Sequence, residues 1–213
     1  MLENLPEKAI VIVVMLGVAF PIHEFSHAFA ASQLGDSTAR LFGRLTLNPV
    51  AHFDPVGGSL MAISILLGGG FGWAKPTPVN PMNLRGGKQG QAIVAAAGPI
   101  SNLVLAIAGA IPLRFLLASR MNVPELETIL LLFVYINLLL MVFNLIPIPP
   151  LDGAGVLFAF LPPQTAWQLR ATLSQYGFLI LIFLIFPVFG GTSVLERVFD
   201  TFVDPIFRLL VGV

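Results

Sequence analysis

Three residues near the amino terminus have the types and the spacing of a metal-dependent hydrolytic site. His23, Glu24 and His27 form the pattern H-E-x-x-H within FPIHEFSHAFAA, residues 20–31. On a helix, side chains four positions apart lie on one face, about 6 Å apart along the axis, so both imidazoles can ligate one ion. Glu24 projects about 100° around the helix from His23. That direction places it beside the ion, where it can take a proton from metal-bound water.

Two histidines are not a complete site, because a catalytic zinc ion uses three protein ligands and keeps one position open. The chain has no cysteine, so the third ligand must be His, Asp or Glu. The candidates are Asp36, Asp54 and Asp152, and Asp152 is favoured because strongly apolar sequence surrounds it. A carboxylate there costs about 2.5–3.5 kcal/mol unless it is paired or faces water. The prolines of IPIPP, residues 146–150, break the helix before it, which indicates a polar pocket.

Several other polar residues have two interpretations each. Asn144 lies eight residues before that aspartate. It either donates to a substrate or developing oxyanion, or it holds two helices together. His52 and Asp54 flank one loop and are either ligands or their supports, or ordinary loop residues near the membrane surface. For Asn102, a role in helix packing is favoured over a role in catalysis. WAKPTPVNP, residues 73–81, is either a gate over the site or a rigid surface turn.

The composition predicts an integral membrane protein. Hydrophobic residues make up 56% of the 213 residues and charged residues only 10%, against about 25% charged in ordinary soluble domains. So few charges could not cover the surface of a soluble globule. The formal net charge is zero, which predicts no nucleic-acid partner. The lipid bilayer is therefore the expected surrounding of this chain.

The apolar segments predict an all-α polytopic membrane fold with four to five transmembrane helices. About 20 residues cross a bilayer, and four stretches are long enough: residues 8–31, 92–118, 126–148 and 173–190. Residues 56–72 are short and Gly-rich, which predicts either a thin span or a re-entrant segment. Near 38–48, a rough alternation of apolar and polar residues around a glycine predicts a short β-hairpin.

We expect a single membrane-embedded domain over 1–193, followed by a separate segment over 194–213. In that segment apolar residues at helical spacing lie between charged ones, which predicts an amphipathic helix at the membrane interface. Residues 1–8 lack the positive charge of a secretory signal, so no cleaved signal is expected. Lys and Arg are nearly balanced between the two sides, so charge alone does not predict the orientation.

These motifs resemble the site-2 protease family of intramembrane zinc metalloproteases, in its small bacterial and archaeal branch without PDZ or CBS domains. HEFSH is followed far downstream by NLIPIPPLDG, and LNPVAHFDPVGG, GWAKPTPVNP and AAAGPISNLVLA are also similar. The resemblance covers roughly residues 15–160. It implies that His23, His27 and Asp152 bind one zinc ion, that Glu24 is the general base, and that Asn144 supports the substrate or the transition state.

The resemblance also implies the setting of the reaction. The partner would be a transmembrane protein substrate already trimmed by another protease, cleaved in or near its span. The protein would lie in the plasma membrane of a prokaryote, with the active site opening toward the cytosol. The alternative is a non-catalytic membrane metal-binding or scaffold protein, against which Glu24 argues because a zinc carrier needs no base. A transporter would predict inverted repeats and charges on several helices, and neither is present in the sequence. Substrate identity and oligomeric state are not predicted.

Overall fold

The computed structural model of this chain describes residues 4–68, 70–119, 121–187 and 191–212, and within these it contains helices and no strand. By length and composition, four helices can cross a membrane: Leu5–Gln33, α6 over Lys88–Ser119, α7 over Pro124–Asn144 and α9 over Pro163–Ile185. The expected all-α membrane fold is therefore confirmed, with the lower of the predicted helix counts among the described residues. Positions 188–190 of the predicted 173–190 span lie outside the described residues.

The first spanning helix changes its winding just before the histidines. It consists of α1 over Leu5–Val14, a π-helical turn, η1, over Met15–Ala19, and α2 over Phe20–Gln33. Pro21 has no N–H to donate, and in a regular helix its ring would clash with the carbonyl four residues earlier. The wider turn, in which the Phe20 N–H donates to the Met15 carbonyl, accommodates that proline. The π turn thus sets the rotation at which α2 presents its histidines.

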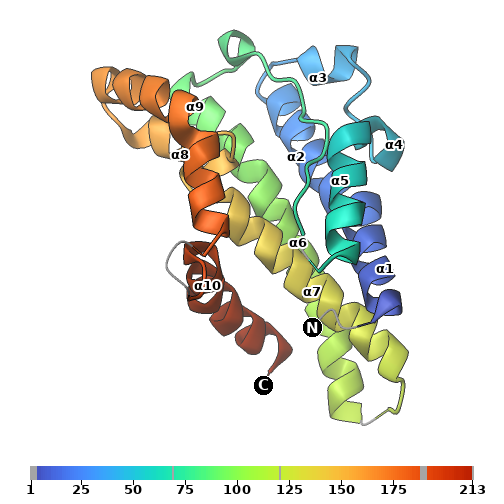
Figure 1. The fold of residues 1–213 in the computed structure, drawn as a ribbon. Coiled ribbons are helices and arrows are strands. Elements are labelled where there is room, and N and C mark those ends of the chain that lie inside the picture. The colour runs from blue at the N-terminus through green and yellow to red at the C-terminus, as the bar shows by residue number, and fades with distance from the viewer. Residues whose placement is uncertain (1–3, 69, 120, 188–190, 213) are drawn as a thin grey trace.

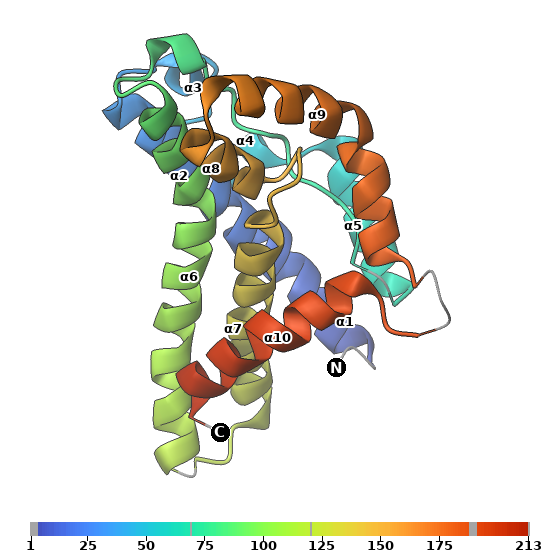
Figure 2. The same ribbon diagram turned by 90° about the vertical axis from the view of Figure 1, so that its left-hand side faces the viewer.

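The centre of the fold is the antiparallel pair α6 and α7, which α10 over Val194–Val211 crosses obliquely (Figure 2). Lipid tails are as apolar as leucine, so packing inside a membrane depends on close contact rather than on water exclusion. Small residues provide that contact. Ala106 and Ala110 of α6 are buried against Val134 and Leu138 of α7. The first spanning helix and α10 both pack against this pair.

The predicted hairpin near 38–48 is not supported, because the chain there forms the short helix α3 over Thr38–Leu41. The Asp36 carboxylate accepts from the Thr38 N–H at 3.0 Å, a local bond that starts a helical turn. Gly43 follows in the left-handed region, with φ of 67°, and ends it. The residues whose alternation predicts a strand thus include a short helical turn, which follows the Asp36 hydrogen bond and ends before Gly43. A second short helix, α4 over Pro49–His52, follows.

The predicted segment 56–72 enters the bundle as a helix and returns as an extended chain. The helix α5 spans Pro55–Leu66, whose 12 residues rise about 18 Å, too short for a hydrocarbon core of about 30 Å. Lys8 Nζ donates to the Leu66 carbonyl at 2.8 Å, so the end of α5 lies beside the start of α1. The chain then runs back along α5, and the Lys75 N–H donates to the His52 carbonyl at 2.9 Å (Figure 1). This return favours the re-entrant alternative, which stays a prediction as regards the membrane.

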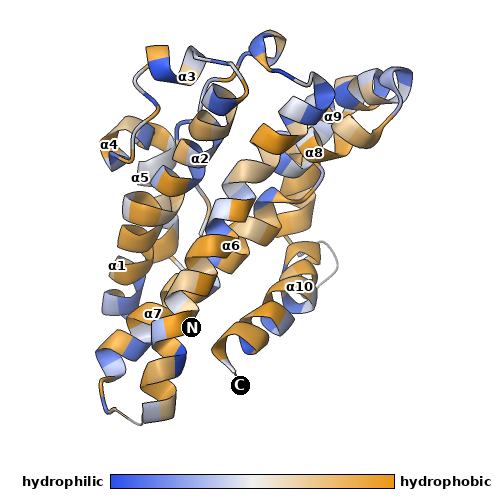
Figure 3. Ribbon diagram, turned by 180° about the vertical axis from the view of Figure 1, so that it is seen from behind, coloured by the Kyte–Doolittle hydropathy of each residue, from blue (hydrophilic) through white to orange (hydrophobic). Residues whose placement is uncertain are grey.

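The remaining elements follow the expected distribution of polarity. Apolar residues fill the middle of the long helices, and polar residues gather at their ends and in the loops (Figure 3). The short 3-10 helix η2 over Pro81–Asn83 precedes α6, and α8 over Asp152–Phe160 lies between α7 and α9. A capping box between Ser193 and Glu196 begins α10. The helix predicted for the 194–213 segment is thus present, whereas its place at the interface stays a prediction.

Candidate metal centre

Three side chains from two distant parts of the chain meet inside the bundle. His23 and His27 are 6% and 7% exposed, so almost no water reaches them. The Asp152 Oδ2 atom lies 3.1 Å from His23 Nε2 and 3.3 Å from His27 Nε2. The two Nε2 atoms are themselves 3.1 Å apart. This is the group predicted from the sequence, and among the described residues it is the one cluster of His, Asp and Glu whose ligand atoms could hold a metal ion together.

The hydrogen bonds behind the histidines decide which ring atoms carry protons. His27 Nδ1 lies 2.7 Å from the Val94 carbonyl, which can only accept, so Nδ1 must donate. His23 Nδ1 lies 2.7 Å from Asn102 Oδ1, also an acceptor, and must donate as well. In the neutral rings both Nε2 atoms are then unprotonated, and their lone pairs face a carboxylate oxygen. Asp152 Oδ2 is buried and makes no hydrogen bond.

The two Nε2 atoms and Asp152 Oδ2 are three acceptors in close contact, and such an arrangement is unstable without a positive charge between them. A cation bound by two imidazoles and a carboxylate satisfies all three, and this nitrogen and oxygen donor set suits zinc. The partners behind the rings fit as well, because metal-ligating histidines almost always donate their other N–H to a carbonyl or carboxylate. The residues present therefore fit the metal that the H-E-x-x-H pattern predicts.

Gly98 on α6 keeps the space in front of the histidines free. A Cβ atom at this position would lie 2.4 Å from His27 Nε2 and 2.6 Å from His23 Nε2, closer than real contacts allow. Val94, Gly98 and Asn102 follow one another at four-residue intervals, so they form one face of α6. That face supplies a carbonyl for His27, an open space for the ligand atoms and an amide oxygen for His23.

Asp152 reaches the histidines because the chain stops being helical after α7. The helix ends at Asn144, and turns over residues 145–151 lead to Asp152 as the first residue of α8. The IPIPP prolines prevent α7 from continuing, as the sequence predicted. Position in the first turn also suits a carboxylate, because the amino terminus of a helix carries partial positive charge. The α8 helix packs against α6, and α6 also packs against α2, which carries both histidines.

Glu24 lies under the returning extended segment. Its Oε2 atom accepts a hydrogen bond from the Thr77 N–H at 2.7 Å, and its main-chain carbonyl accepts from Thr77 Oγ1 at 2.9 Å. Arg44 is 4% exposed and donates through Nη2 to the Lys75 carbonyl, which holds the same segment two residues earlier. The WAKPTPVNP segment is thus hydrogen-bonded to Glu24, as the gate interpretation requires. The alternative interpretation, a rigid surface turn, also remains compatible with these contacts.

The pKa values of two charged residues in the segments between the long helices, Asp36 and Arg44, are shifted. Burial alone would raise the pKa of Asp36, but hydrogen bonds from Thr38, Asn80 and Asn83 outweigh it and hold that pKa below its ordinary value of 3.8. Burial lowers the pKa of Arg44, and the negative charge of Glu24 partly opposes that effect. Asp36 therefore remains ionised and ties the 36–38 turn to the 80–83 turn through the Asn80 N–H and the Asn83 side chain, at 2.7 and 3.1 Å.

Comparison with known proteins agrees with this geometry. A family model described as Peptidase family M50 matches residues 108–187. The chain is 37% identical over 207 residues to a Bacillus subtilis protein named "Putative zinc metalloprotease YwhC", covering 93% of this chain and 90% of that protein. The chain belongs to peptidase family M50, the site-2 protease family.

Two further relatives carry the name "Putative zinc metalloprotease Rip2". The Mycolicibacterium smegmatis protein is 34% identical over 167 residues, covering 77% of this chain and 62% of that protein. The Mycobacterium tuberculosis H37Rv protein is 30% identical over 181 residues, covering 82% and 66%. No solved structure matches the chain. The names of these relatives support a metalloprotease and zinc as its metal.

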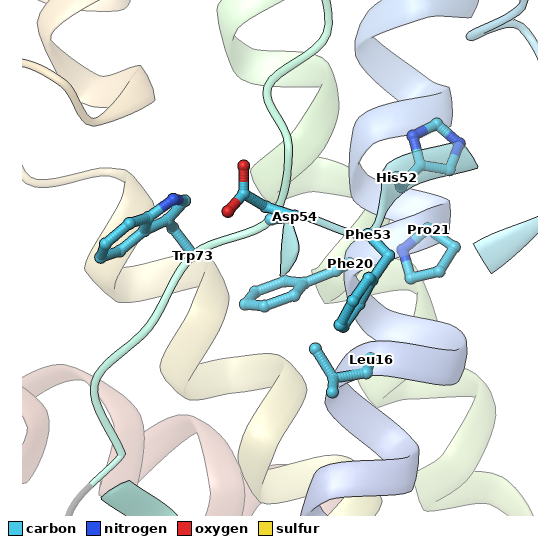
Figure 4. A pocket seen from close by; sticks show the side chains of 8 residues that line it. Leu16, Phe20, Pro21, His52, Phe53, Asp54 and Trp73 are labelled. Atoms are coloured by element: carbon cyan, nitrogen blue, oxygen red, sulfur yellow. The ribbon is translucent and has the colours of Figure 1, made fainter. Parts of the chain in front are cut away.

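The other candidate ligands of this M50 chain lie outside the cluster. His52 and Asp54 line a separate small pocket, with Phe20 and Phe53 between Trp73 and His52 (Figure 4). His52 Nε2 contacts the Thr46 carbonyl at 2.7 Å. Asp54 caps α5 by accepting from two main-chain N–H groups. These contacts agree with the interpretation of His52 and Asp54 as ordinary loop residues, and a supporting role for either at the site stays a prediction.

Asn144 is near the site in sequence, but its observed contact is local. Its Nδ2 donates to the Leu140 carbonyl at 2.9 Å, within its own helix, and the side chain is half-buried at the end of α7. Its predicted role toward a substrate therefore stays a prediction. Nδ2 carries a second N–H, so this amide could donate to a substrate while it keeps its bond to the Leu140 carbonyl.

Sequence reasoning missed Gly98 and Thr77 and gave Asn102 only a packing role. Asn102 and Gly98 had a usable signal, because a glycine and an asparagine four apart in an apolar span share one face. Thr77 had none, since nothing in WAKPTPVNP distinguishes the residue whose N–H meets Glu24. That contact depends on how α5 turns the chain back.

Proposed function

We propose that this protein is an intramembrane zinc endopeptidase that hydrolyses peptide bonds in or near the transmembrane segments of membrane proteins. One observation carries the proposal: two imidazole nitrogens and a carboxylate oxygen converge among spanning helices, with Glu24 next to one of the imidazoles in the chain. Membership of the M50 family supports the same reaction class. A site held inside the bundle suits a substrate whose target bond is itself in or near the membrane.

Each residue has a distinct task in this proposal. His23, His27 and Asp152 would hold one zinc ion, which would act as a Lewis acid and lower the pKa of bound water toward neutrality. Glu24 takes the proton of the attacking water and returns it to the leaving amine. The Thr77 N–H holds Oε2 of that carboxylate at 2.7 Å, which leaves Oε1 to move the proton. Asn144 donates from its amide to the substrate backbone or to the developing oxyanion.

The membrane setting is part of the proposal. We place the chain in the plasma membrane of a prokaryote, with α10 along the interface and the active site opening toward the cytosol. The ends that carry α3, α4 and the return of the re-entrant segment would then face the cytosol. Because the chain has no cysteine, single cysteines at Arg40 and at Glu125 can be labelled from either side of sealed vesicles. Labelling of the Arg40 position from the cytosolic side alone is expected, and the reverse pattern would contradict this orientation.

Metal content tests the site. We would purify wild type, His23→Ala, Asp152→Ala and Glu125→Gln in mild detergent and measure bound zinc. About one zinc per chain is expected in wild type and in Glu125→Gln, whose side chain is exposed at the far end of α7. Loss is expected in the two ligand variants. Full retention in Asp152→Ala would remove the third ligand and with it the proposed site.

Cleavage separates the enzyme from the scaffold alternative. Wild type, Glu24→Gln and Glu125→Gln would be reconstituted with a single-span reporter carrying a different fluorophore at each end. Glu24→Gln should keep its zinc and lose cleavage by about 10²–10⁴-fold, since it lacks only the general base. Metal-loaded wild type that is no faster than Glu24→Gln on a panel of such reporters would favour the non-catalytic metal-binding protein instead.

A further inference from the structure

Two asparagines that the proposed reaction does not use form a buried chain behind His23. Asn102 of α6 and Asn137 of α7 are both 0% exposed, which is rare for a polar side chain in an apolar bundle. Asn102 Nδ2 donates to Asn137 Oδ1 at 3.1 Å, and Asn137 Nδ2 donates to the Phe133 carbonyl at 2.9 Å. Asn102 Oδ1 lies 2.7 Å from His23 Nδ1. The chain therefore joins three helices and ends on a metal-ligand candidate.

The direction of every bond in this chain follows from its far end. The Phe133 carbonyl can only accept, so Asn137 must turn its NH₂ group toward it. Asn137 then presents its oxygen to Asn102, which must answer with its own NH₂ group. Only the oxygen of Asn102 is left for His23, so His23 Nδ1 carries the proton and Nε2 is bare. A main-chain carbonyl on α7 thus sets the tautomer of an imidazole on α2.

His27 is oriented in the same way, but by a single hydrogen bond rather than by a chain of side chains. Its Nδ1 donates directly to the Val94 carbonyl of α6 at 2.7 Å. The main chain of α6 faces His27, but at His23 a side chain must fill the same role. A neutral amide does so without placing a second buried carboxylate beside Asp152, which would cost several kcal/mol in this environment. Substitution can therefore test the His23 support, whereas it cannot remove the His27 support.

We propose that Asn102 is a positioning residue that sets the metal affinity of the site by fixing the His23 tautomer, and that Asn137 fixes Asn102 in turn. This inference rests on the proposed function, because it assumes that His23 is a metal ligand. Outer partners of metal-bound histidines typically contribute 10–100-fold to metal affinity. We expect that loss from Asn102→Leu, which nearly preserves volume and removes the acceptor. Asn137→Leu should lose less metal affinity, because Asn102 keeps its Oδ1 acceptor, although its side-chain amide is then free to flip.

A purely structural asparagine gives a different pattern from a positioning one. Asn102→Asp keeps an acceptor for His23 Nδ1, and carboxylates commonly support metal-ligating histidines. It should therefore hold metal affinity within a few-fold of wild type, whereas its buried charge and the lost donor to Asn137 should lower the Tm of the metal-free protein. If Asn102 served only to join helices, Asp would fail at least as badly as Leu. Ser101→Ala is the matched control, because its hydroxyl bonds the Gly98 carbonyl of its own helix at 2.6 Å.

The experiment measures cobalt binding to the full chain in detergent, by competition with a chelator and by the visible absorption of bound Co²⁺. We expect wild type, Ser101→Ala and Asn102→Asp to bind cobalt with similar affinity. Asn137→Leu should bind more weakly. Asn102→Leu should bind most weakly, 10–100-fold below wild type, and its cobalt absorption bands should be weaker. Equal affinity of wild type and Asn102→Leu would overturn this inference and leave the proposed function intact. Equal losses in Asn102→Asp and Asn102→Leu would also overturn it. No cobalt binding by wild type would overturn both. Should Asn102→Leu not fold, Asn137→Leu against wild type decides.

Discussion

Replacing Gly98 by alanine is a small change that should strongly weaken metal binding while leaving the fold intact. The new methyl group would lie 2.4 Å from His27 Nε2 and 2.6 Å from both Nε2 and Cε1 of His23. It would therefore occupy the space in which the ligand atoms meet. No ligand is removed and no charge is changed. Any loss of metal would then report on that space alone.

The size of the effect follows from the distances. Ordinary contacts begin at 3.4 Å, so a ligand ring or α6 itself must move by about 1 Å to admit the methyl group. A displacement of that size typically costs about 100-fold at a catalytic site, which is about 2.7 kcal/mol. Alanine is also the better helix former, by about 0.8–1.0 kcal/mol, so the helix itself should not be weakened. We therefore expect the zinc affinity to fall about 100-fold with unchanged helicity.

Zinc content, circular dichroism and a chelator competition would be measured for wild type, Gly98→Ala and Gly17→Ala. Gly17 lies in the same spanning helix as the histidines, and a Cβ there would meet nothing within 4 Å. Gly17→Ala should bind zinc as wild type does. Metal retained by Gly98→Ala with wild-type affinity would refute the reasoning, because the ligand atoms would then have to meet somewhere other than in front of α6.

Two further predictions concern the loops around the site. Asp36→Asn should lower Tm at neutral pH by about 4 °C or more, since the carboxylate accepts four hydrogen bonds. The folded-state pKa of Asp36 is depressed, so its stabilisation is present above its ordinary pKa of 3.8 and is lost as pH falls through the folded value. The Tm difference between wild type and Asp36→Asn, followed by scanning fluorimetry from pH 7 to 3, should shrink at the acid end. A constant difference would contradict this. Gly72→Ala would bring a Cβ to 2.3 Å from Met61 Cβ and should push the returning segment off α5, and so Thr77 off Glu24. Reporter cleavage should fall about tenfold or more with zinc retained, whereas Gly70→Ala, with nothing within 4 Å, should cleave normally. Equal rates in both variants would show that this segment does not position the base.

The sequence predicted the spanning helices and the three candidate ligands because those features are local or strongly constrained. A long apolar run has few alternatives to a membrane helix, since each main-chain polar group must be satisfied within the segment. The H-E-x-x-H pattern fixes its own geometry on a helix. Asp152 could be singled out because a carboxylate after broken, apolar sequence needs a partner, and few partners exist in this chain. The hairpin failed for the opposite reason, since four or five alternating residues fit a capped helical turn equally well.

The contacts that the sequence could not predict depend on the register between helices. Glu24 meets Thr77 only because α5 stops after 12 residues and the chain turns back along it. Val94, Gly98 and Asn102 were visible as one face of a helix, but nothing in the sequence states that this face lies against His23 and His27. One turn of sliding between α2 and α6 would bring a different trio forward. Register is set by the close contacts of small residues along α6, and those are properties of the packed pair.

The same register explains why a site of this kind can be assembled from neutral groups before any metal is bound. In an apolar bundle a charged support for each histidine would be costly, and the two supports present are a main-chain carbonyl and an amide backed by another main-chain carbonyl. Both derive their direction from helix carbonyls, which are fixed wherever the helices are. The only permanent charge among the three ligands is then Asp152, and its uncompensated buried oxygen is what attracts a cation. Binding strength and ligand geometry are thus separated: Asp152 supplies the charge, and α6 and α7 supply the orientation.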